Sequence, residues 1–118
     1  MKRRSPSADP FALVKSIGLA MPDVEASIRY DGSPVLKAGG SFMAGIATDE
    51  SAEADTLVVR CEVEDRELFI EDAPDIYYVT EFYAKYPLVL ARLSKLDEGA
   101  IRDLLAVSRR MALEKARR

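Results

Sequence analysis

Four short extended segments between residues 25 and 62 constrain the fold more than any other feature of the sequence. The first three are separated by the turn pairs Asp31-Gly32 and Gly39-Gly40, and the fourth follows an acidic loop of small residues. Such pairs supply the positive φ angles that tight hairpins require, and strands joined by short hairpins pair antiparallel. The pattern therefore predicts an antiparallel meander with strands at residues 27–30, 35–38, 42–47 and 56–61.

Helical spacing flanks this meander on both sides. Asp9-Pro10 is typical of an N-cap followed by proline at the first helical position, and Asp97 is typical of another N-cap. The order α-ββββ-α-ββ-α predicts an α+β fold, a two-layer sandwich with an antiparallel sheet of about six strands and three helices on one face. Residues 1–8 are predicted to be a flexible basic tail and residues 9–118 a single domain. The elements outside the meander are predicted at residues 9–21, 63–73, 76–80 and 88–93 and from residue 97 onward.

The absence of histidine narrows the possible chemistry. The 118 residues include no histidine and one cysteine, Cys61, which excludes Ser-His and Cys-His catalysis, His-ligated metal sites and an internal disulfide. The sequence also lacks a phosphate-binding glycine loop, a nucleophile elbow, a cleavable signal peptide and a bilayer-spanning apolar run. We therefore expect a cytoplasmic, non-enzymatic protein with no cofactor and no metal. Catalysis by a carboxylate or a lysine stays open as a less favoured alternative.

Three motifs, in order along the chain, carry a family resemblance. They are residues 19–25 (LAMPDVE), residues 30–44 (YDGSPVLKAGGSFMA) and residues 78–93 (YVTEFYAKYPLVLARL). Together they resemble motifs of the MmcQ/YjbR-like proteins, a widespread bacterial family, over about residues 10 to 112. The resemblance implies a two-layer sandwich similar to the frataxin-like and secretion-chaperone-like folds. It also implies DNA binding, the label that members of this family often carry.

Several positions depart from the pattern of that family. The replacements are Phe82 for a common histidine, Ser41 for a lysine, and Leu88 and Arg109 for tryptophans. If the histidine or the lysine performs chemistry or binds phosphate in relatives, this chain lacks that role.

Charge is divided unevenly along the chain. Residues 1–4 and 102–118 hold 9 basic and 2 acidic side chains, a net charge of +7, whereas residues 5–101 carry a net charge of -10. Cations of the tail and the last helix could grip phosphates with little base specificity. The nucleic-acid candidates are Lys2, Arg3, Arg4, Arg102, Arg109, Arg110, Arg117 and Arg118. The alternative is a solvated helix face with a basic tail, which the sequence pI of about 5.0 favours.

An acidic stretch runs through the predicted second helix. Residues 49–75 contain 11 acidic and 2 basic side chains, and Leu68, Phe69 and Ile70 form the apolar part of the helix. The acids lack the spaced ligand order of a calcium loop. We therefore interpret them as a solvated helix face.

Aromatic residues are concentrated in residues 77–86, which contain Tyr77, Tyr78, Phe82, Tyr83 and Tyr86. We expect some of these rings to fill the core and others to edge a groove, with their hydroxyls hydrogen-bonded. A groove here would make the protein a protein-interaction or small-ligand module, the alternative to DNA binding. Pure packing is the other interpretation, and exposed edge strands would allow a homodimer. The pocket candidates are Tyr30, Lys37, Thr80, Tyr83, Tyr86 and Arg92.

Overall fold

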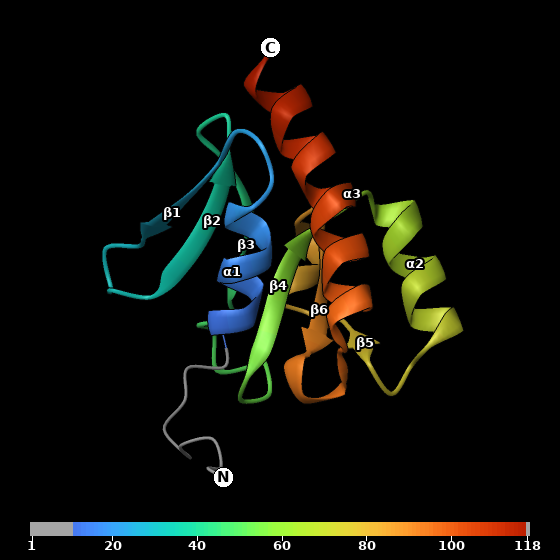
Figure 1. The fold of residues 1–118 in the computed structure, drawn as a ribbon. Helices are drawn as coiled ribbons and strands as arrows, with labels where there is room; N and C mark the ends of the chain where they lie inside the picture. Colours follow the sequence, from blue (N-terminus) through green and yellow to red (C-terminus); the bar gives the residue numbers. More distant parts are fainter. Residues whose placement is uncertain (1–10, 118) are drawn as a thin grey trace, which may run out of the picture.

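A six-stranded antiparallel sheet in the order β1-β2-β3-β4-β6-β5 organises the computed structural model, which describes residues 11–117 (Figure 1). The strands are β1 (Val24–Ile28), β2 (Pro34–Ala38), β3 (Ser41–Ile46), β4 (Thr56–Arg60), β5 (Tyr77–Tyr78) and β6 (Leu88–Arg92). The helices are α1 (Ala12–Leu19), α2 (Val63–Asp72) and α3 (Glu98–Ala116), with 3-10 turns at Tyr83–Lys85 and Leu93–Lys95. This arrangement confirms the predicted α+β fold.

Local turn chemistry explains the meander. Gly32 closes the β1–β2 connection with a φ of 88°, and Gly39 and Gly40 turn β2 into β3 with φ values of 59° and 81°. A residue with a Cβ atom is strained at such angles, whereas glycine adopts them readily. The two turn pairs therefore favour the observed antiparallel pairing of β1 with β2 and of β2 with β3.

The fifth strand is shorter than the sequence predicts. β5 has two residues instead of residues 76–80, whereas β1 begins earlier than predicted because its first residues also pair with β2. The backbone N–H of Ile76 donates to the carbonyl of Ala73 in a turn (3.0 Å), and the carbonyl of Thr80 accepts from the N–H of Ala84 (2.8 Å). Turns on both sides of β5 therefore take up backbone groups that a longer strand would use in the sheet.

The main hydrophobic core lies between the sheet and the helices, which cover one of its faces (Figure 1). Leu36, Leu57 and Val59 of the sheet pack in this core with Leu104 and Leu105 of α3, and all five side chains are buried. Burial of a leucine or valine side chain contributes about 1.5–3 kcal/mol, so this layer supplies much of the stability.

The last helix begins at its predicted N-cap and buries one stripe of its side chains. The carboxylate of Asp97 caps it by accepting a hydrogen bond from the backbone N–H of Ala100 at 2.8 Å. Ser108 lies on the buried stripe and donates its hydroxyl to the carbonyl of Met43, so its polar group is satisfied within the core. The apolar members of the stripe are Ile101, Leu104, Leu105 and Ala112.

The opposite face of the sheet is covered at β4 and β6 by residues 77–86, called here the tyrosine segment. Val58 and Leu90 point to this face, because side chains alternate along a strand and their neighbours face the helices. They form a second cluster with Leu88 and the buried ring of Tyr83. The sheet is therefore packed on both faces in this half of the molecule.

The ends of the chain fall outside the described residues. This applies to the predicted tail at residues 1–8, to the predicted N-cap Asp9 and to Arg118. None of the helices within residues 11–117 combines the length and the apolar character that crossing a bilayer requires.

Candidate functional site

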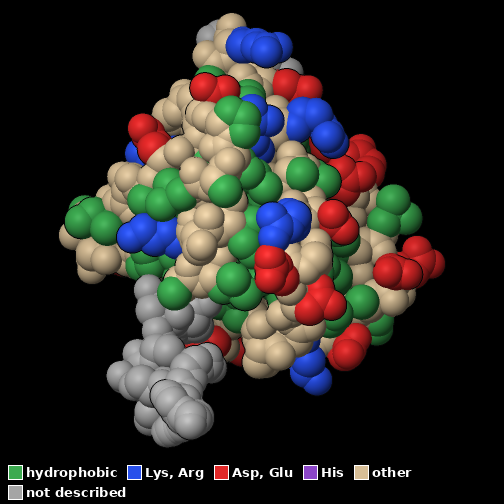
Figure 2. Space-filling model, viewed as in Figure 1, with side chains coloured by type: hydrophobic (Ala, Val, Ile, Leu, Met, Phe, Trp, Pro, Cys, Tyr) green, Lys and Arg blue, Asp and Glu red, His purple; other side chains and the backbone are tan. Residues whose placement is uncertain are grey.

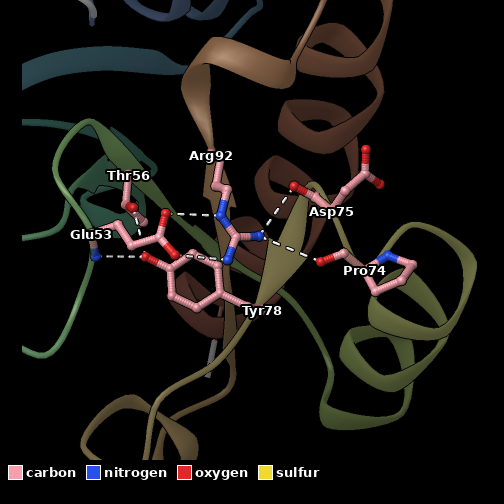
Figure 3. Close-up of polar contacts among 6 residues, drawn as sticks. All are labelled: Glu53, Thr56, Pro74, Asp75, Tyr78 and Arg92. Carbon is pink, nitrogen blue, oxygen red and sulfur yellow. Dashed lines mark hydrogen bonds and ion pairs between the residues drawn. The ribbon is translucent and has the colours of Figure 1, made fainter.

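Arg92 is one of the pocket candidates from the sequence, and its guanidinium is hydrogen-bonded to other residues of the protein (Figure 3). Its guanidinium donates to both carboxylate oxygens of Glu53 at 2.9 and 2.8 Å, and lies 4.3 Å from the ring centroid of Tyr78. It also donates to the carbonyls of Pro74 and Asp75 at 3.4 and 3.1 Å. The hydrogen bonds from Arg92 hold the pKa of the Glu53 carboxyl below its ordinary value. Arg92 therefore joins the loop between β3 and β4 to the turn before β5.

Tyr78 and Thr80 of the tyrosine segment hold the same β3–β4 loop. The hydroxyl of Tyr78 accepts the backbone N–H of Glu53 at 2.8 Å and shares a hydrogen bond with Thr56 at 2.7 Å (Figure 3). The hydroxyls of Thr80 and Ser51 lie 2.9 Å apart and share another. These bonds connect residues more than 20 positions apart in the sequence, so the loop is fixed by tertiary structure.

Tyr83 completes the attachment of this loop. Its hydroxyl accepts the backbone N–H groups of Thr48 and Asp49 at 3.2 and 3.0 Å, while its ring is buried. A buried tyrosine whose hydroxyl accepts two backbone amides supports the chain rather than presenting a free group to a ligand. The expectation that some of these rings pack and find partners for their hydroxyls is confirmed.

The six pocket candidates divide between two halves of the sheet. Tyr30 is fully exposed after β1 and Lys37 lies on β2, whereas the other candidates lie on β6 or in the tyrosine segment. Two strands, β3 and β4, separate these groups in the sheet order. The second group consists of Thr80, Tyr83, Tyr86 and Arg92. The described structure therefore does not gather the six around one cavity, and ligand binding by any of them stays a prediction.

Two of the arginines expected to bind nucleic acid are engaged with neighbouring groups. Arg102 forms an ion pair with Glu98 one turn earlier in α3. Arg109 donates to the carbonyl of Pro22 at 2.8 Å and lies 3.6 Å from the carboxylate of Asp23. Each arginine has a carboxylate beside it, which weakens its attraction for a phosphate.

The remaining cationic candidates differ in their surroundings. Arg117 is exposed at the end of α3, and Arg110 lines a groove whose other charged residues are acidic. Lys2, Arg3, Arg4 and Arg118 lie outside the described residues. Nucleic-acid binding by these residues stays a prediction.

An open groove of about 730 Å³ lies between α2 and α3. Its α2 side follows the spacing Asp65, Leu68, Phe69 and Asp72, which places these residues on one face of a helix. Phe69 packs against Tyr77 with ring centroids 4.9 Å apart, whereas Leu68 is 62% exposed. The lining residues are Asp65, Leu68, Phe69, Glu71, Asp72, Val107 and Arg110. The groove thus has an apolar floor beside an acidic wall.

Acidic side chains outnumber basic ones on α2. None of the five acids on α2 forms an ion pair within residues 11–117. Its one cation, Arg66, is 8% exposed and donates instead to backbone carbonyls of the tyrosine segment and β6. Figure 2 shows the acidic side chains gathered over α2 at the right of the molecule. The five acids are Glu64, Asp65, Glu67, Glu71 and Asp72.

Reactive and metal-binding groups contribute little to this surface. Cys61 is buried before α2, and burial raises the pKa of its thiol to about 12, so the thiol is protonated at neutral pH. Within residues 11–117, no three histidine, cysteine or acidic side chains converge as metal ligands. The features that remain are shape, apolar area and charge.

Comparison with known proteins shows a similarity of fold and no match of sequence family. No known family model matches this sequence, and no curated protein matches it. A solved structure of a Bacillus subtilis protein of the DUF1801 family, YdhG, is similar at a TM-score of 0.50 and 19% identity, over 94% of this chain and 86% of that chain. At this identity the similarity shows the fold alone.

The predicted membership of the MmcQ/YjbR-like family is wrong. No family model matches the chain, and the structural neighbour belongs to a different family. Two of the three motifs, at residues 30–44 and 78–93, contain residues with a local structural role in this fold. Gly39 and Gly40 make a hairpin turn, while Tyr78 and Tyr83 hold a loop through their hydroxyls. Turns and loop supports of this kind are requirements of a backbone, so they do not identify a family by themselves.

Proposed function

We propose that this protein is a cytoplasmic, non-enzymatic protein-interaction module and that the groove between α2 and α3 is its binding surface. The observation that carries the proposal is Leu68, a large apolar side chain that is 62% exposed within an acidic helix. Beside it, Phe69 and Val107 extend the apolar floor along the groove. Contiguous apolar surface with a polar rim is typical of protein-binding sites.

The contrast with the tyrosine segment supports this choice of surface. The polar groups of Tyr78, Tyr83 and Arg92 are already bonded within the protein, so a ligand would have to compete with those bonds. The carboxylates of Asp65 and Asp72 have no cationic partner within residues 11–117. A partner protein can therefore bind these carboxylates without first breaking an internal ion pair.

Nucleic-acid binding through α3 is the less favoured proposal. Arg102 and Arg109 lie next to carboxylates, and Arg110 shares its groove with three acids. Phosphates approaching the groove would meet like charge, which costs binding energy. A specific gel shift at low salt that Arg110→Glu abolishes would favour this alternative over the groove.

Site-specific cross-linking tests the proposal. A photoreactive amino acid placed at position 68 of the full chain should cross-link one protein in cells. The matched position 13 on α1, where Leu13 is also exposed, should not cross-link that protein. The cross-linked protein is then purified and its affinity for the chain is measured.

The affinity measurements decide the outcome. Leu68→Asp should weaken binding at least about tenfold, while Leu13→Asp changes it less than about twofold. Equal cross-linking at the two positions would contradict the proposal. So would a purified partner whose affinity is unchanged by Leu68→Asp. Circular dichroism melting of both variants establishes that each is folded.

A further inference from the structure

We infer, building on the proposed function, that the occupant of the groove is a basic amphipathic helix of a partner protein. Its apolar side chains would lie on Leu68, Phe69 and Val107, and its lysines or arginines would face the acids of α2. The inference rests on the backbone of the groove walls, on the spacing of the lining residues and on the position of their charges.

The walls of the groove favour a helical occupant over an extended one. Both walls, α2 and α3, are helices, so the backbone N–H and C=O groups along their middles are paired within each helix. An extended peptide gains affinity by adding its backbone to an open sheet edge, which helix walls do not offer. A helix satisfies its own backbone groups and needs only side-chain contacts from the groove.

The spacing of the lining residues fits a helix-in-groove contact. On α2 the lining runs from Asp65 to Asp72, a separation of seven positions that spans about 10 Å at a rise of about 1.5 Å per residue. Val107 and Arg110 on α3 are one turn apart and form the facing wall. A contact of this length receives apolar residues of a partner helix at positions i, i+3 or i+4, and i+7.

The charges of the groove specify the polar face of the occupant. Asp65, Glu71 and Asp72 all come from α2, whereas Arg110, the single lining cation among the described residues, comes from α3. The groove is therefore polarised across its width rather than along its length. A bound helix would place its cations along the edge that faces α2, and a neutral or acidic residue opposite Arg110.

Peptide titration tests the inference directly. The probe is a synthetic, end-blocked lysine–leucine peptide of about 18 residues, about five helical turns, with its leucines on one helix face. Its binding to the full chain is measured by calorimetry at about 50 and 300 mM NaCl. Binding should be one to one and at least about fivefold weaker at the higher salt. A glutamate–leucine peptide of the same pattern should not bind, and a lysine–leucine peptide with a central proline should bind at least about tenfold more weakly.

Two matched charge reversals on α2 locate the site. Asp72 lines the groove, whereas Glu67 is exposed on the same helix and does not line it. Asp72→Lys should weaken the lysine–leucine peptide about tenfold, and Glu67→Lys less than about twofold. Melting curves of both variants establish that each is folded.

Each result separates the inference from the function on which it rests. Equal losses in the two variants would mean unspecific attraction to an acidic surface and would overturn the inference. Equal binding of the glutamate or proline peptide would overturn it as well. If the basic peptide fails to bind while a partner still depends on Leu68, the helix inference is wrong and the protein-interaction function stands. A concentration-dependent dimer that Leu68→Asp disrupts would identify a second copy as the occupant instead.

Discussion

The tyrosine segment and the α2–α3 groove are two regions of the same domain that use polar residues in opposite ways. Tyr78 and Tyr83 of the tyrosine segment, together with Arg92 of the adjoining strand β6, direct their polar groups at the β3–β4 loop, and each has partners at hydrogen-bond distance. Along the groove, the acids of α2 have no ion-pair partner within residues 11–117, and Leu68 projects beside them. Unusual residue types therefore do not mark a binding surface when their polar groups are already hydrogen-bonded within the fold.

The largest expected change in the free energy of unfolding follows substitution of Arg66, whose side chain extends from α2 to the tyrosine segment. Its guanidinium donates to the carbonyls of Ala84, Tyr86 and Leu88 at 3.3, 3.1 and 3.2 Å. Arg66→Leu leaves these acceptors without their donor and should lower the free energy of unfolding by about 3 kcal/mol, as measured by urea denaturation. Glu67→Ala, its exposed neighbour, is the control and should change that free energy by less than about 0.5 kcal/mol. Similar values for both variants would contradict a structural role for Arg66.

A smaller loss is expected when one hydroxyl is removed from the tyrosine segment. Tyr83→Phe keeps the buried ring but deprives the N–H groups of Thr48 and Asp49 of their acceptor. The free energy of unfolding should fall by about 1–2 kcal/mol in urea denaturation. Tyr86→Phe, the same change at a half-exposed ring, should leave stability within about 0.5 kcal/mol of the original. No difference between the two variants would show that the hydroxyl of Tyr83 does not hold the loop.

The contact between Glu53 and Arg92 should make stability depend on pH. Hydrogen bonds from Arg92 depress the pKa of the Glu53 carboxyl from its ordinary value of 4.5, so its contribution is present above that value. The stabilisation from this contact is lost as the pH falls below 4.5 and the carboxylate becomes protonated. Glu53→Gln should therefore lose less stability than the original chain over this range in thermal melts. Glu25→Gln, the same change at an exposed strand position, is the control, and identical pH profiles for all three proteins would refute the assignment.

The smallest effect on folding is expected in the groove itself. Leu68→Ser removes an apolar side chain that the fold does not bury, so the free energy of unfolding should change by less than about 0.5 kcal/mol. Phe69→Ser, at the next position, loses its packing on Tyr77 and should cost more than about 1 kcal/mol. If Leu68→Ser is as destabilising as Phe69→Ser, then Leu68 supports the core. The exposed apolar side chain would then no longer be evidence that the groove binds a partner.

The parts of the fold that depend on local chemistry could be predicted from the sequence. Asp31-Gly32 and Gly39-Gly40 make the hairpin turns, and Asp97 caps α3, because each acts on backbone within a few residues. The length of β5 could not be predicted, since Ile76 forms a turn instead of extending the strand. The competition between a turn and a strand is settled by what packs around the chain, which a local pattern does not contain.

The candidate site was harder to predict than the fold. The composition of the tyrosine segment indicated a groove with Arg92 among its lining residues. In the structure the guanidinium of Arg92 instead donates to the carboxylate of Glu53, 39 positions earlier in the sequence. The acidic stretch of α2 was interpreted as a solvated face, although the spacing of Asp65, Leu68 and Asp72 on one helix face was a signal that could have marked the groove. The exposure of Leu68 follows from how α2 lies on the sheet and beside α3.

The sequence by itself determined the antiparallel meander, the helices and the exclusion of histidine chemistry, because these depend on local backbone preferences and residue types. Only the tertiary structure decided which charged side chains are bonded to other parts of the protein and which form no ion pair within the described residues. Arg66 and Arg92 are held by carbonyls and a carboxylate far away in the sequence, while the acids of α2 form no ion pair within residues 11–117. The physical reason is that charge and apolar area become available to a partner only when the folded chain leaves them uncompensated.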